Sequence, residues 1–350
     1  MSVPNQVVLL GSKGAAGKMH VQAYQHLNVT VKGFDIIDGP ISEVDILSIN
    51  WPEVIVDVCT PTSTHVDSLT WAYALGARKF ILEKPAARSN AEWRSVLPTL
   101  PGAQIFVVLP YLFSKAFQCA VNLVSDVIEV DCVFNKDRAL DDERRRGANI
   151  SGIHPHALQI EGPHQMAMLL AISPTLAVSQ VHCVSRGVRG AAPSVPLDCT
   201  VTMTDSVVRR AMLSTDLRAP RERRLRLVGK SGHVVHVYFS TSSELEARVE
   251  RQIGSGPVEI VWSGRDDILQ RTLDAALTSI NAGTIPWEAS AAFSSIVLAA
   301  LDNAMACLAV EPDLPSEEFA PPLAHTVAYT PPLAYASART GVAAGSQSDE

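Results

Sequence analysis

The sequence lacks any surplus of positive charge. Its 350 residues include 29 lysines and arginines against 36 aspartates and glutamates, so the formal net charge is -7 at pH 7. Nucleic-acid binding requires a basic face that neutralises phosphates, and we therefore expect no nucleic-acid partner. The one cationic run, Arg144 to Arg146, follows Asp141, Asp142 and Glu143. We interpret it as a solvated loop, with a clamp for an anionic substrate group as the alternative.

Closely spaced cysteines are also lacking. The chain contains no CxxC pair, and its six cysteines are scattered at Cys59, Cys119, Cys132, Cys183, Cys199 and Cys307. Disulfide frameworks and zinc sites both need clustered cysteines. We therefore expect reduced, mostly buried thiols and no structural metal.

No uninterrupted apolar run reaches the roughly 18 residues that a membrane-spanning helix needs. The most apolar segment, Ala291 to Val310, is interrupted by Ser294, Ser295, Asp302 and Asn303. The first residues, MSVPNQVVLLG, include neither a basic stretch nor a long apolar core, so no signal peptide is evident. A cytoplasmic protein without a membrane partner is the default expectation.

Length and composition indicate a large folded protein. At 350 residues the chain exceeds a typical single domain, so two domains are expected. Hydrophobic residues make up 47% of the chain and charged residues 19%, which supports packed cores rather than disorder. After Glu311 the sequence is rich in Pro, Ala and Ser, and we expect an extended or disordered tail there.

A βαβ unit is predicted between Val54 and Pro85. Val54 to Cys59 is an apolar strand, and a Thr-Pro turn then leads into a helix that ends at Gly76. A second apolar strand, Lys79 to Leu82, follows. Continuous apolar runs joined by a helix of this length are typical of buried parallel strands.

Polar residues follow both strands of this unit. Thr60, Pro61 and Thr62 come after the first strand, and Glu83 and Lys84 come after the second. Ligands of open α/β sheets bind outside the carboxyl ends of the strands. Both loops are therefore expected to open on the same crevice.

A glycine-rich turn near the start of the chain predicts a dinucleotide site. Val7 to Leu10 is a short apolar strand, and it runs into the turn and then a helix from about Ala16 to His26. Glycines let backbone N–H groups approach a pyrophosphate at the positive end of the helix. The candidate contacts in this turn are Gly11, Lys13, Gly14, Ala15, Ala16 and Gly17.

Asp35 ends the next strand, about Val29 to Phe34. An acidic group roughly 20 residues beyond the glycine turn binds an adenosine ribose. Because a carboxylate there would repel a 2′-phosphate, NAD is favoured as the cofactor. NADP stays open because Lys13 and Lys32 could supply compensating charge, and Asp38 is the alternative carboxylate if the strand ends later.

The βαβ unit resembles one known enzyme family. A strand ending in Thr60-Pro61, a following His65, a helix ending in Gly76 and a strand ending in Glu83-Lys84-Pro85 are similar to the glucose–fructose oxidoreductase and inositol dehydrogenase family, called Gfo/Idh/MocA. The resemblance extends over about Val7 to Val310. It implies that Thr60, Pro61, His65, Glu83 and Lys84 lie around the cofactor.

The glycine turn departs from the family pattern. The family usually carries GxGxxGxxH, whereas the spacing here is GxxGxxG. The loop is therefore one residue longer, while Gly14, Gly17 and His20 keep the GxxGxxH part of the motif. We expect a cofactor site with altered phosphate contacts.

The resemblance implies a fold and a division of the chain. Residues 1–115 would form an α/β Rossmann-type dinucleotide-binding domain, and residues 116–310 an α+β domain with a large open, mainly antiparallel sheet. Residues 311–350 would form the tail. Alternating strand patterns between Ser179 and Trp262 independently favour the antiparallel sheet. In the family this sheet lines the substrate pocket and commonly forms a subunit interface, so a homodimer or homotetramer is expected.

The resemblance also implies catalytic residues. Family enzymes carry a helix in which an acidic residue precedes, by one turn, a His that contacts the substrate carbinol. His164 matches that His, and Glu161 takes the place of the acidic residue with a spacing of three rather than four. The two would share one helix face. His164 would transfer the proton, and Lys84 would stabilise negative charge on the substrate oxygen.

Two further residues are substrate-site candidates. Tyr111 follows the apolar strand from Gln104 to Leu109, where the family often places a residue that faces the nicotinamide; core packing is the alternative. His156 lies in the segment before Glu161 and is kept as a substrate contact, although a structural role is the simpler interpretation. His20 and His65 are interpreted as helix-face residues near the cofactor.

The resemblance predicts an NAD(P)-dependent oxidoreductase. It would transfer a hydride between the nicotinamide and a secondary hydroxyl or ketone of a sugar, amino sugar or cyclitol. One alternative is a reductase of a C=N or conjugated double bond on the same scaffold. Another is a non-catalytic, dinucleotide-binding sensor.

Overall fold

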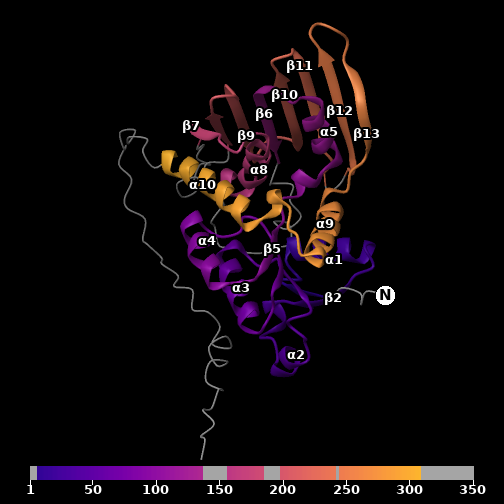
Figure 1. Cartoon of the computed structure of the whole chain (residues 1–350), viewed down its shortest axis with the longest axis vertical. Helices are drawn as coiled ribbons and strands as arrows, with labels where there is room; N and C mark the ends of the chain where they lie inside the picture. Colours follow the sequence, from indigo (N-terminus) through magenta and orange to yellow (C-terminus); the bar gives the residue numbers. More distant parts are fainter. Residues whose placement is uncertain (1–5, 137–155, 185–197, 242–243, 309–350) are drawn as a thin grey trace, which may run out of the picture.

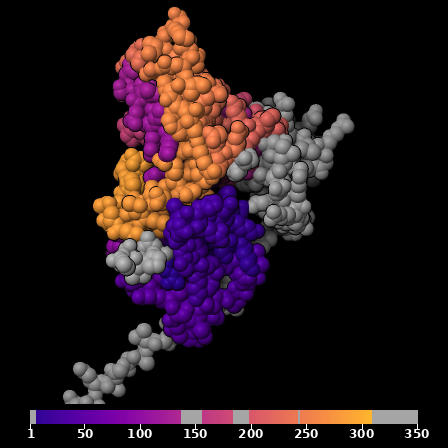
Figure 2. Space-filling view, turned by 90° about the vertical axis from the view of Figure 1, so that its right-hand side faces the viewer, coloured from indigo at the N-terminus to yellow at the C-terminus, as the bar shows by residue number. Residues whose placement is uncertain are grey.

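The computed structural model describes residues 6–136, 156–184, 198–241 and 244–308. The predicted tail and the polar segment before His156 lie largely outside these ranges. The described residues form two sheets, which Figure 1 shows one above the other along the long axis of the molecule. Figure 2 shows the same arrangement from the side, with the N-terminal part at the bottom.

The first sheet has five parallel strands in the order β2-β1-β3-β4-β5. Its strands are β1 Gln6–Leu10, β2 Thr30–Phe34, β3 Ile55–Val58, β4 Lys79–Leu82 and β5 Gln104–Val107. The chain turns to one side of β1 for β2 and to the other side for β3. In open α/β sheets a ligand crevice lies at such a reversal of strand order.

Helices connect these strands, and three of them begin at serine caps. They are α1 Ala15–His26, α2 Glu43–Leu47, α3 His65–Ala74, α4 Asn90–Val96 and α5 Lys115–Leu123, with short 3-10 turns η1 Ile36–Asp38, η2 Thr62–Thr64, η3 Leu97–Thr99 and η4 Pro110–Phe113. The side chains of Ser42, Ser89 and Ser114 accept backbone N–H groups at the starts of α2, α4 and α5. Gly76, with φ +108°, ends the turn after α3.

The second sheet has eight strands in the order β13-β12-β11-β10-β6-β9-β8-β7. They are β6 Val127–Asn135, β7 Ala177–Val184, β8 Asp198–Thr204, β9 Arg210–Asp216, β10 Glu222–Gly229, β11 His233–Tyr238, β12 Glu246–Ile253 and β13 Glu259–Arg265. All neighbours pair antiparallel except β6 and β9, which are parallel. The predicted open, mainly antiparallel sheet is therefore confirmed.

Two helices, α7 Ala157–Ile160 and α8 Gly162–Ile172, occupy the segment for which one helix was predicted. They are separated at Glu161, because Pro163 in the first turn of α8 starts a new helix. The prediction of a single helix is therefore wrong. The buried amide of Gln165 on α8 donates to the carbonyls of Cys132 and Ser214, which fixes α8 against the second sheet.

The last two helices pack against both parts of the molecule. Helix α9 Ile268–Ala282 lies against α1, and α10 Ala291–Leu308, preceded by η6 Trp287–Ala289, lies against α4, α8 and β7 (Figure 1). The domain boundaries proposed from the sequence remain a prediction.

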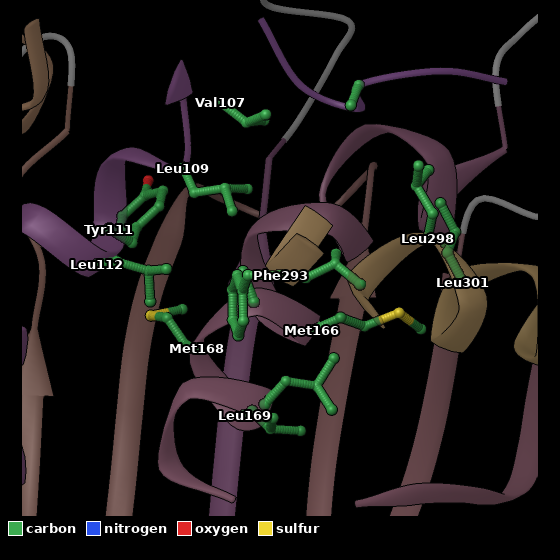
Figure 3. Packing of buried hydrophobic residues seen from close by; sticks show 14 of the residues in the cluster. Val107, Leu109, Tyr111, Leu112, Met166, Met168, Leu169, Phe293, Leu298 and Leu301 are labelled. Carbon is green, nitrogen blue, oxygen red and sulfur yellow. The ribbon is translucent and has the colours of Figure 1, made fainter. Parts of the chain in front are cut away.

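One hydrophobic core joins the two sheets. Figure 3 shows side chains from the end of β5, from α8 and from α10 pointing toward one another: Leu109, Tyr111, Met166, Met168, Phe293, Leu298 and Leu301. By length and composition α10 could cross a membrane, but seven of its residues are buried in the protein. The packing is that of a core helix.

A disulfide joins Cys183 on β7 to Cys199 on β8. The prediction that all six cysteines are reduced is therefore wrong for this pair. Sixteen positions separate the two cysteines in sequence, but they are direct partners in the β7–β8 ladder. Sequence spacing cannot show which residues of two strands lie opposite each other. Cys59, Cys119, Cys132 and Cys307 are free.

Candidate functional site

The glycine turn packs too tightly for side chains at two positions. Gly11 has φ +86°, and a Cβ there would lie 2.7 Å from the Cys59 carbonyl oxygen. A Cβ on Gly17 would lie 2.1 Å from the Gly11 carbonyl oxygen. Helix α1 starts at Ala15 with Gly14 as its N-cap, so Ala15 and Ala16 form its first turn. The first N–H groups of a helix have no intrahelical acceptors, which makes this turn a candidate anion site.

Asp35 lies at the carboxyl end of β2, beside the glycine turn. One carboxylate oxygen accepts the Lys13 N–H at 2.8 Å, and the other accepts the Ile37 N–H at 3.1 Å. A residue of the lengthened glycine loop thus helps to hold Asp35. The Lys13 ammonium forms an ion pair with Asp38.

The second lysine considered for a 2′-phosphate is also paired. Lys32 contacts the Asp45 carboxylate at 3.0 Å and donates to the Ser48 hydroxyl at 3.0 Å. The Lys32 ammonium therefore points toward α2 rather than toward Asp35.

His20 connects the glycine-turn helix to two strands of the sheet. Its Nδ1 lies 2.7 Å from an Asp57 carboxylate oxygen, and its Nε2 lies 2.9 Å from Glu83 Oε1. His20 and Asp57 are completely buried. Burial alone would lower the pKa of His20, but the Asp57 carboxylate and Cys59 raise it well above its ordinary value. An imidazolium here lies between two carboxylates.

The hydrogen-bonded network of His20 also affects the pKa values of its neighbours. Burial would raise the pKa of Glu83, but the hydrogen bond and charge of His20 lower it below the ordinary value. Tyr24 donates to Asp57 at 2.8 Å. Burial raises the pKa of the Cys59 thiol, which keeps it protonated and unreactive. The sequence analysis missed Asp57, although an Asp within the apolar run VIVDVC signals a buried, partnered carboxylate.

His65 connects the loops that follow β3 and β4. Its Nε2 lies 2.8 Å from the Thr60 carbonyl and its Nδ1 lies 2.9 Å from the Pro85 carbonyl. Burial lowers the pKa of His65, so the ring is neutral and donates to one of the two carbonyls at a time. The Thr60-Pro61 turn and the Glu83-Lys84-Pro85 turn are thereby held side by side, as the sequence predicted.

Lys84, which follows β4, lies near enough to His164 on α8 for its charge to act on the imidazole ring. The Lys84 ammonium donates to the Ile160 carbonyl, at the end of α7, at 3.1 Å. Burial lowers the pKa of His164 well below its ordinary value, and the nearby cations Lys84 and Arg223 lower it further. His164 is therefore neutral at pH 7. Its Nδ1 is buried and has no hydrogen-bond partner among the described residues.

Glu161 pairs with an arginine that the sequence analysis missed. Arg223 on β10 donates to Glu161 Oε1 at 2.9 Å and to the Tyr111 hydroxyl at 3.2 Å. Its guanidinium lies over the Phe134 ring, 4.6 Å from the centroid. The side chains of Arg223 and Glu161 are only 8% and 6% exposed, so this is a buried ion pair.

A signal for Arg223 was present in the strand pattern. Leu225 and Leu227 on β10 face the core, and Arg223 falls on the same face by the period of two. Its neighbours Arg224 and Arg226 lie on the other face and bind the carboxylates of Glu222 and Asp131. An arginine on the apolar face of a strand indicates a buried acidic partner.

The other two substrate-site candidates, Tyr111 and His156, lie in different places. Tyr111 is buried, and its ring contacts His164 edge-on with centroids 5.2 Å apart, so it lies within the site. His156 lies at the opposite end of α7 from the Ile160 carbonyl. Its Nδ1 accepts the Leu158 N–H, and its Nε2 faces Cys199.

The space beside Lys84 is small and apolar. A cavity with room for about one water is lined there by Lys84, Pro163, Ser294 and several aliphatic side chains. A larger cavity of about 560 Å³ lies between α5, the end of α8 and Pro286, and none of the predicted site residues lines it. The segment from Asn135 to His156, which was expected to contact substrate, lies mostly outside the described residues.

No protein-family model matches this sequence, and comparison with curated proteins finds no match. The structure is, however, similar to solved oxidoreductases over most of its length. UDP-N-acetylglucosamine 3-dehydrogenase GnnA from Acidithiobacillus ferrooxidans aligns with a TM-score of 0.69 at 17% identity, covering 87% of this chain and 98% of that one.

Two further structures are similar to the same extent. KijD10, a 3-ketoreductase from Actinomadura kijaniata in complex with NADP and TDP-benzene, aligns with a TM-score of 0.67 at 13% identity, covering 87% of this chain and 98% of that one. GenD2 from gentamicin A biosynthesis, in complex with NAD, aligns with a TM-score of 0.66 at 17% identity, covering 89% of this chain and 95% of that one. The chain therefore shares its fold with these proteins, and the fold predicted from the Gfo/Idh/MocA resemblance is confirmed.

The His20 network predicts a specific pH dependence of stability. The pKa of His20 in the folded protein is raised above its unfolded value near 6.5. The stability that His20 contributes to the folded state is therefore complete below that pH. It is lost as the pH rises through the folded pKa. His20→Gln should lower the free energy of unfolding by about 3–5 kcal/mol at low and neutral pH, and by less in alkali. Urea denaturation at several pH values measures this, with exposed His26→Gln on the same helix as the control; equal losses at all pH values would contradict it.

The buried Arg223–Glu161 pair predicts a strong difference between neighbouring arginines. Arg223→Met leaves a buried carboxylate without its partner and should lower the free energy of unfolding by about 3–5 kcal/mol. Arg224→Met, on the outer face of the same strand, should cost less than about 1 kcal/mol. Adding Glu161→Gln to Arg223→Met should recover much of the loss in urea denaturation. Similar effects of the two single substitutions would show that the pair is not buried in solution.

Proposed function

We propose that this chain is a nicotinamide-dependent oxidoreductase that acts on a secondary hydroxyl or ketone of a sugar, amino sugar or cyclitol. The observation that carries the proposal is the proximity of the Lys84 ammonium, just past the carboxyl end of β4, to the neutral His164 ring on α8. The similar folds of a sugar-nucleotide dehydrogenase and a 3-ketoreductase support it.

The residues around the glycine turn fit a dinucleotide. Glycine at positions 11 and 17 lets the turn pack closely against the end of β3 and the start of α1, as the tight turn of a dinucleotide site requires. We assign the pyrophosphate to the turn formed by Gly11, Lys13, Gly14, Ala15, Ala16 and Gly17. Thr60, Pro61, His65 and Glu83 would border the cofactor where β3 and β4 end.

Asp35 supports NAD over NADP. The backbone N–H groups of Lys13 and Ile37 hold its carboxylate at the end of β2. A 2′-phosphate placed there would be repelled, and both nearby lysines already have carboxylate partners, Asp38 and Asp45. We therefore propose NAD as the preferred cofactor.

The chain's own groups would manage charge while the bound nicotinamide accepts or donates the hydride. In the oxidation direction the neutral His164 ring accepts the hydroxyl proton, and in the reduction direction it returns that proton. The Lys84 ammonium stabilises negative charge that develops on the same oxygen. Lys84 can do so because the Ile160 carbonyl holds it without neutralising its charge.

Glu161 and Tyr111 would then position substrate rather than transfer protons. Arg223 holds both side chains, so the Glu161 carboxylate is fixed in place beside His164. The engagement of Glu161 by Arg223 also favours, as a second candidate, reduction of a C=N bond. Such a reaction would need Lys84 and His164 but no free acidic partner. A cytoplasmic location and an assembly of two or four copies remain predictions.

The cofactor assignment predicts selective binding. NADH should bind more tightly than NADPH when nicotinamide fluorescence is followed in a titration of the purified protein. Asp35→Ala should weaken NADH binding by about tenfold, equivalent to about 1.4 kcal/mol, and should reduce the discrimination against NADPH. Asp274→Ala, on the exposed face of α9, is the control. Absence of binding by either nucleotide would reject the oxidoreductase proposal.

The catalytic assignment predicts loss of turnover without loss of cofactor. Lys84→Met should lower kcat by about 10²-fold or more on a substrate found in a panel of sugar nucleotides, sugars and cyclitols. NADH binding should remain within a few-fold of wild type. Lys79→Met, at the start of the strand that precedes Lys84 and paired at the surface with Glu53, should keep its activity. NADH binding without turnover of any panel member would favour the sensor alternative.

A further inference from the structure

The edge of the second sheet contains a pair of cysteines in direct register. Cys183 on β7 is the ladder partner of Cys199 on β8, with Cα atoms 4.2 Å apart, and the two are joined by a disulfide. Strand β7 is the edge strand of the sheet. Cys183 is partly exposed, whereas Cys199 is completely buried. Of the two cysteines, Cys183 is therefore the one nearer to solvent.

His156 lies against the buried sulfur. Its Nε2 is 4.0 Å from Cys199 Sγ, and its Nδ1 accepts the Leu158 N–H at 3.1 Å as the N-cap of α7. Because Nδ1 is the acceptor, the proton of the neutral ring is on Nε2 and points toward Cys199. Burial lowers the pKa of His156, which favours this neutral form.

The position of this proton decides whether His156, Cys183 and Cys199 suit a metal ion or thiol–disulfide chemistry. The side-chain atoms of His156, Cys183 and Cys199 are close enough together to be considered as a metal site. A metal ion at Nε2 would need the lone pair of that nitrogen, which the proton occupies. If the proton moved to Nδ1, two N–H groups, of His156 and of Leu158, would point at each other and their hydrogen bond would be lost. Two thiolates alone make a poor zinc site, which normally has at least three protein ligands. The arrangement therefore favours sulfur chemistry.

Helix α7 connects this cluster to the candidate active site. The helix is a single turn, Ala157–Ile160, and it packs against β8 and β9. His156 caps its start, and the Ile160 carbonyl at its end accepts the Lys84 ammonium. Glu161, which follows directly, binds Arg223. A shift at the start of so short a helix moves its end as well.

We propose that Cys183 and Cys199 form a reversible thiol–disulfide site, with a low-molecular-weight thiol of the glutathione class as its co-reactant, and that its oxidation state is coupled through His156 and α7 to Lys84. The role of Lys84 in this statement rests on the proposed function. The thiol chemistry and the response of α7 do not.

The exchange proceeds in two steps that balance. A small-molecule thiolate attacks Cys183 Sγ, the S–S bond breaks, and its electron pair goes to Cys199 Sγ, which the His156 Nε2–H stabilises. A second thiolate attacks the mixed disulfide and releases Cys183. The two protein thiolates take up the protons that the two small thiols lost. In sum, a protein disulfide and two thiols give a protein dithiol and one small disulfide, and the reverse reaction uses the oxidised small molecule.

The first test maps the thiols of the full chain. Purified protein is equilibrated in mixtures of reduced and oxidised glutathione and quenched in acid, and its thiols are then alkylated under denaturing conditions and mapped by mass spectrometry of its peptides. We expect six alkylated cysteines in the most reducing mixture and loss of Cys183 and Cys199 together in oxidising ones, with a midpoint reached from both directions. Cys183→Ser should abolish the paired loss, and Cys119→Ser on α5 should leave it unchanged. Alkylation of both cysteines in every mixture would overturn the proposal.

The second test measures the coupling to α7. Hydrogen exchange of wild-type protein should show loss of protection in residues 157–161 on reduction, where the Glu161 N–H donates to the Ala157 carbonyl. Protection that is the same in both oxidation states would overturn the coupling. Binding of one equivalent of Zn²⁺ to the reduced protein, absent in Cys199→Ser, would overturn the assignment in favour of a metal site. None of these measurements uses a nicotinamide or a sugar, so failure here and failure of the proposed function are distinguishable.

Discussion

The placement of His20 between two carboxylates is the constraint on which the candidate cofactor site depends. Asp57 lies within a fully buried strand, where an unpaired carboxylate would be prohibitively costly. His20 and Tyr24, both on α1, supply its partners, and His20 also binds Glu83 at the end of β4. The helix that follows the glycine turn is thus tied to two neighbouring strands, and the turn is held over their carboxyl ends.

A second buried charge pair has the corresponding role on the other side of Lys84. Arg223 reaches from β10 to Glu161, between α7 and α8, and to Tyr111, after β5. Because breaking such a pair leaves an uncompensated buried charge, it fixes the relative position of the second sheet and the site. Lys84 lies between the two networks and is held by a neutral carbonyl at Ile160. It is thereby positioned by its surroundings, and the acceptor of its ammonium is an uncharged carbonyl.

The local features of the site were predictable because local rules govern them. Continuous apolar runs identified β3 and β4, and the run of glycines identified the turn around Gly11. The helix predicted through Glu161 and His164 is in fact two, since a proline at position 163 begins a new helix. That signal is present in the sequence as Gly162-Pro163. Arg223 was missed because its partner, Glu161, lies 62 residues away.

The sequence by itself determined the order of strands and helices, the glycine turn, and which residues end each parallel strand, because periodicity and backbone preference act over a few positions. Only the tertiary structure decided which charges meet. It placed Asp57 against His20, Arg223 against Glu161 and Cys183 opposite Cys199. Such pairings depend on strand register and on burial, which bring distant residues together and make an unpaired charge costly. For this reason the candidate catalytic residues could be predicted from the sequence, whereas the charged partners that shift their pKa values and hold them in place could not.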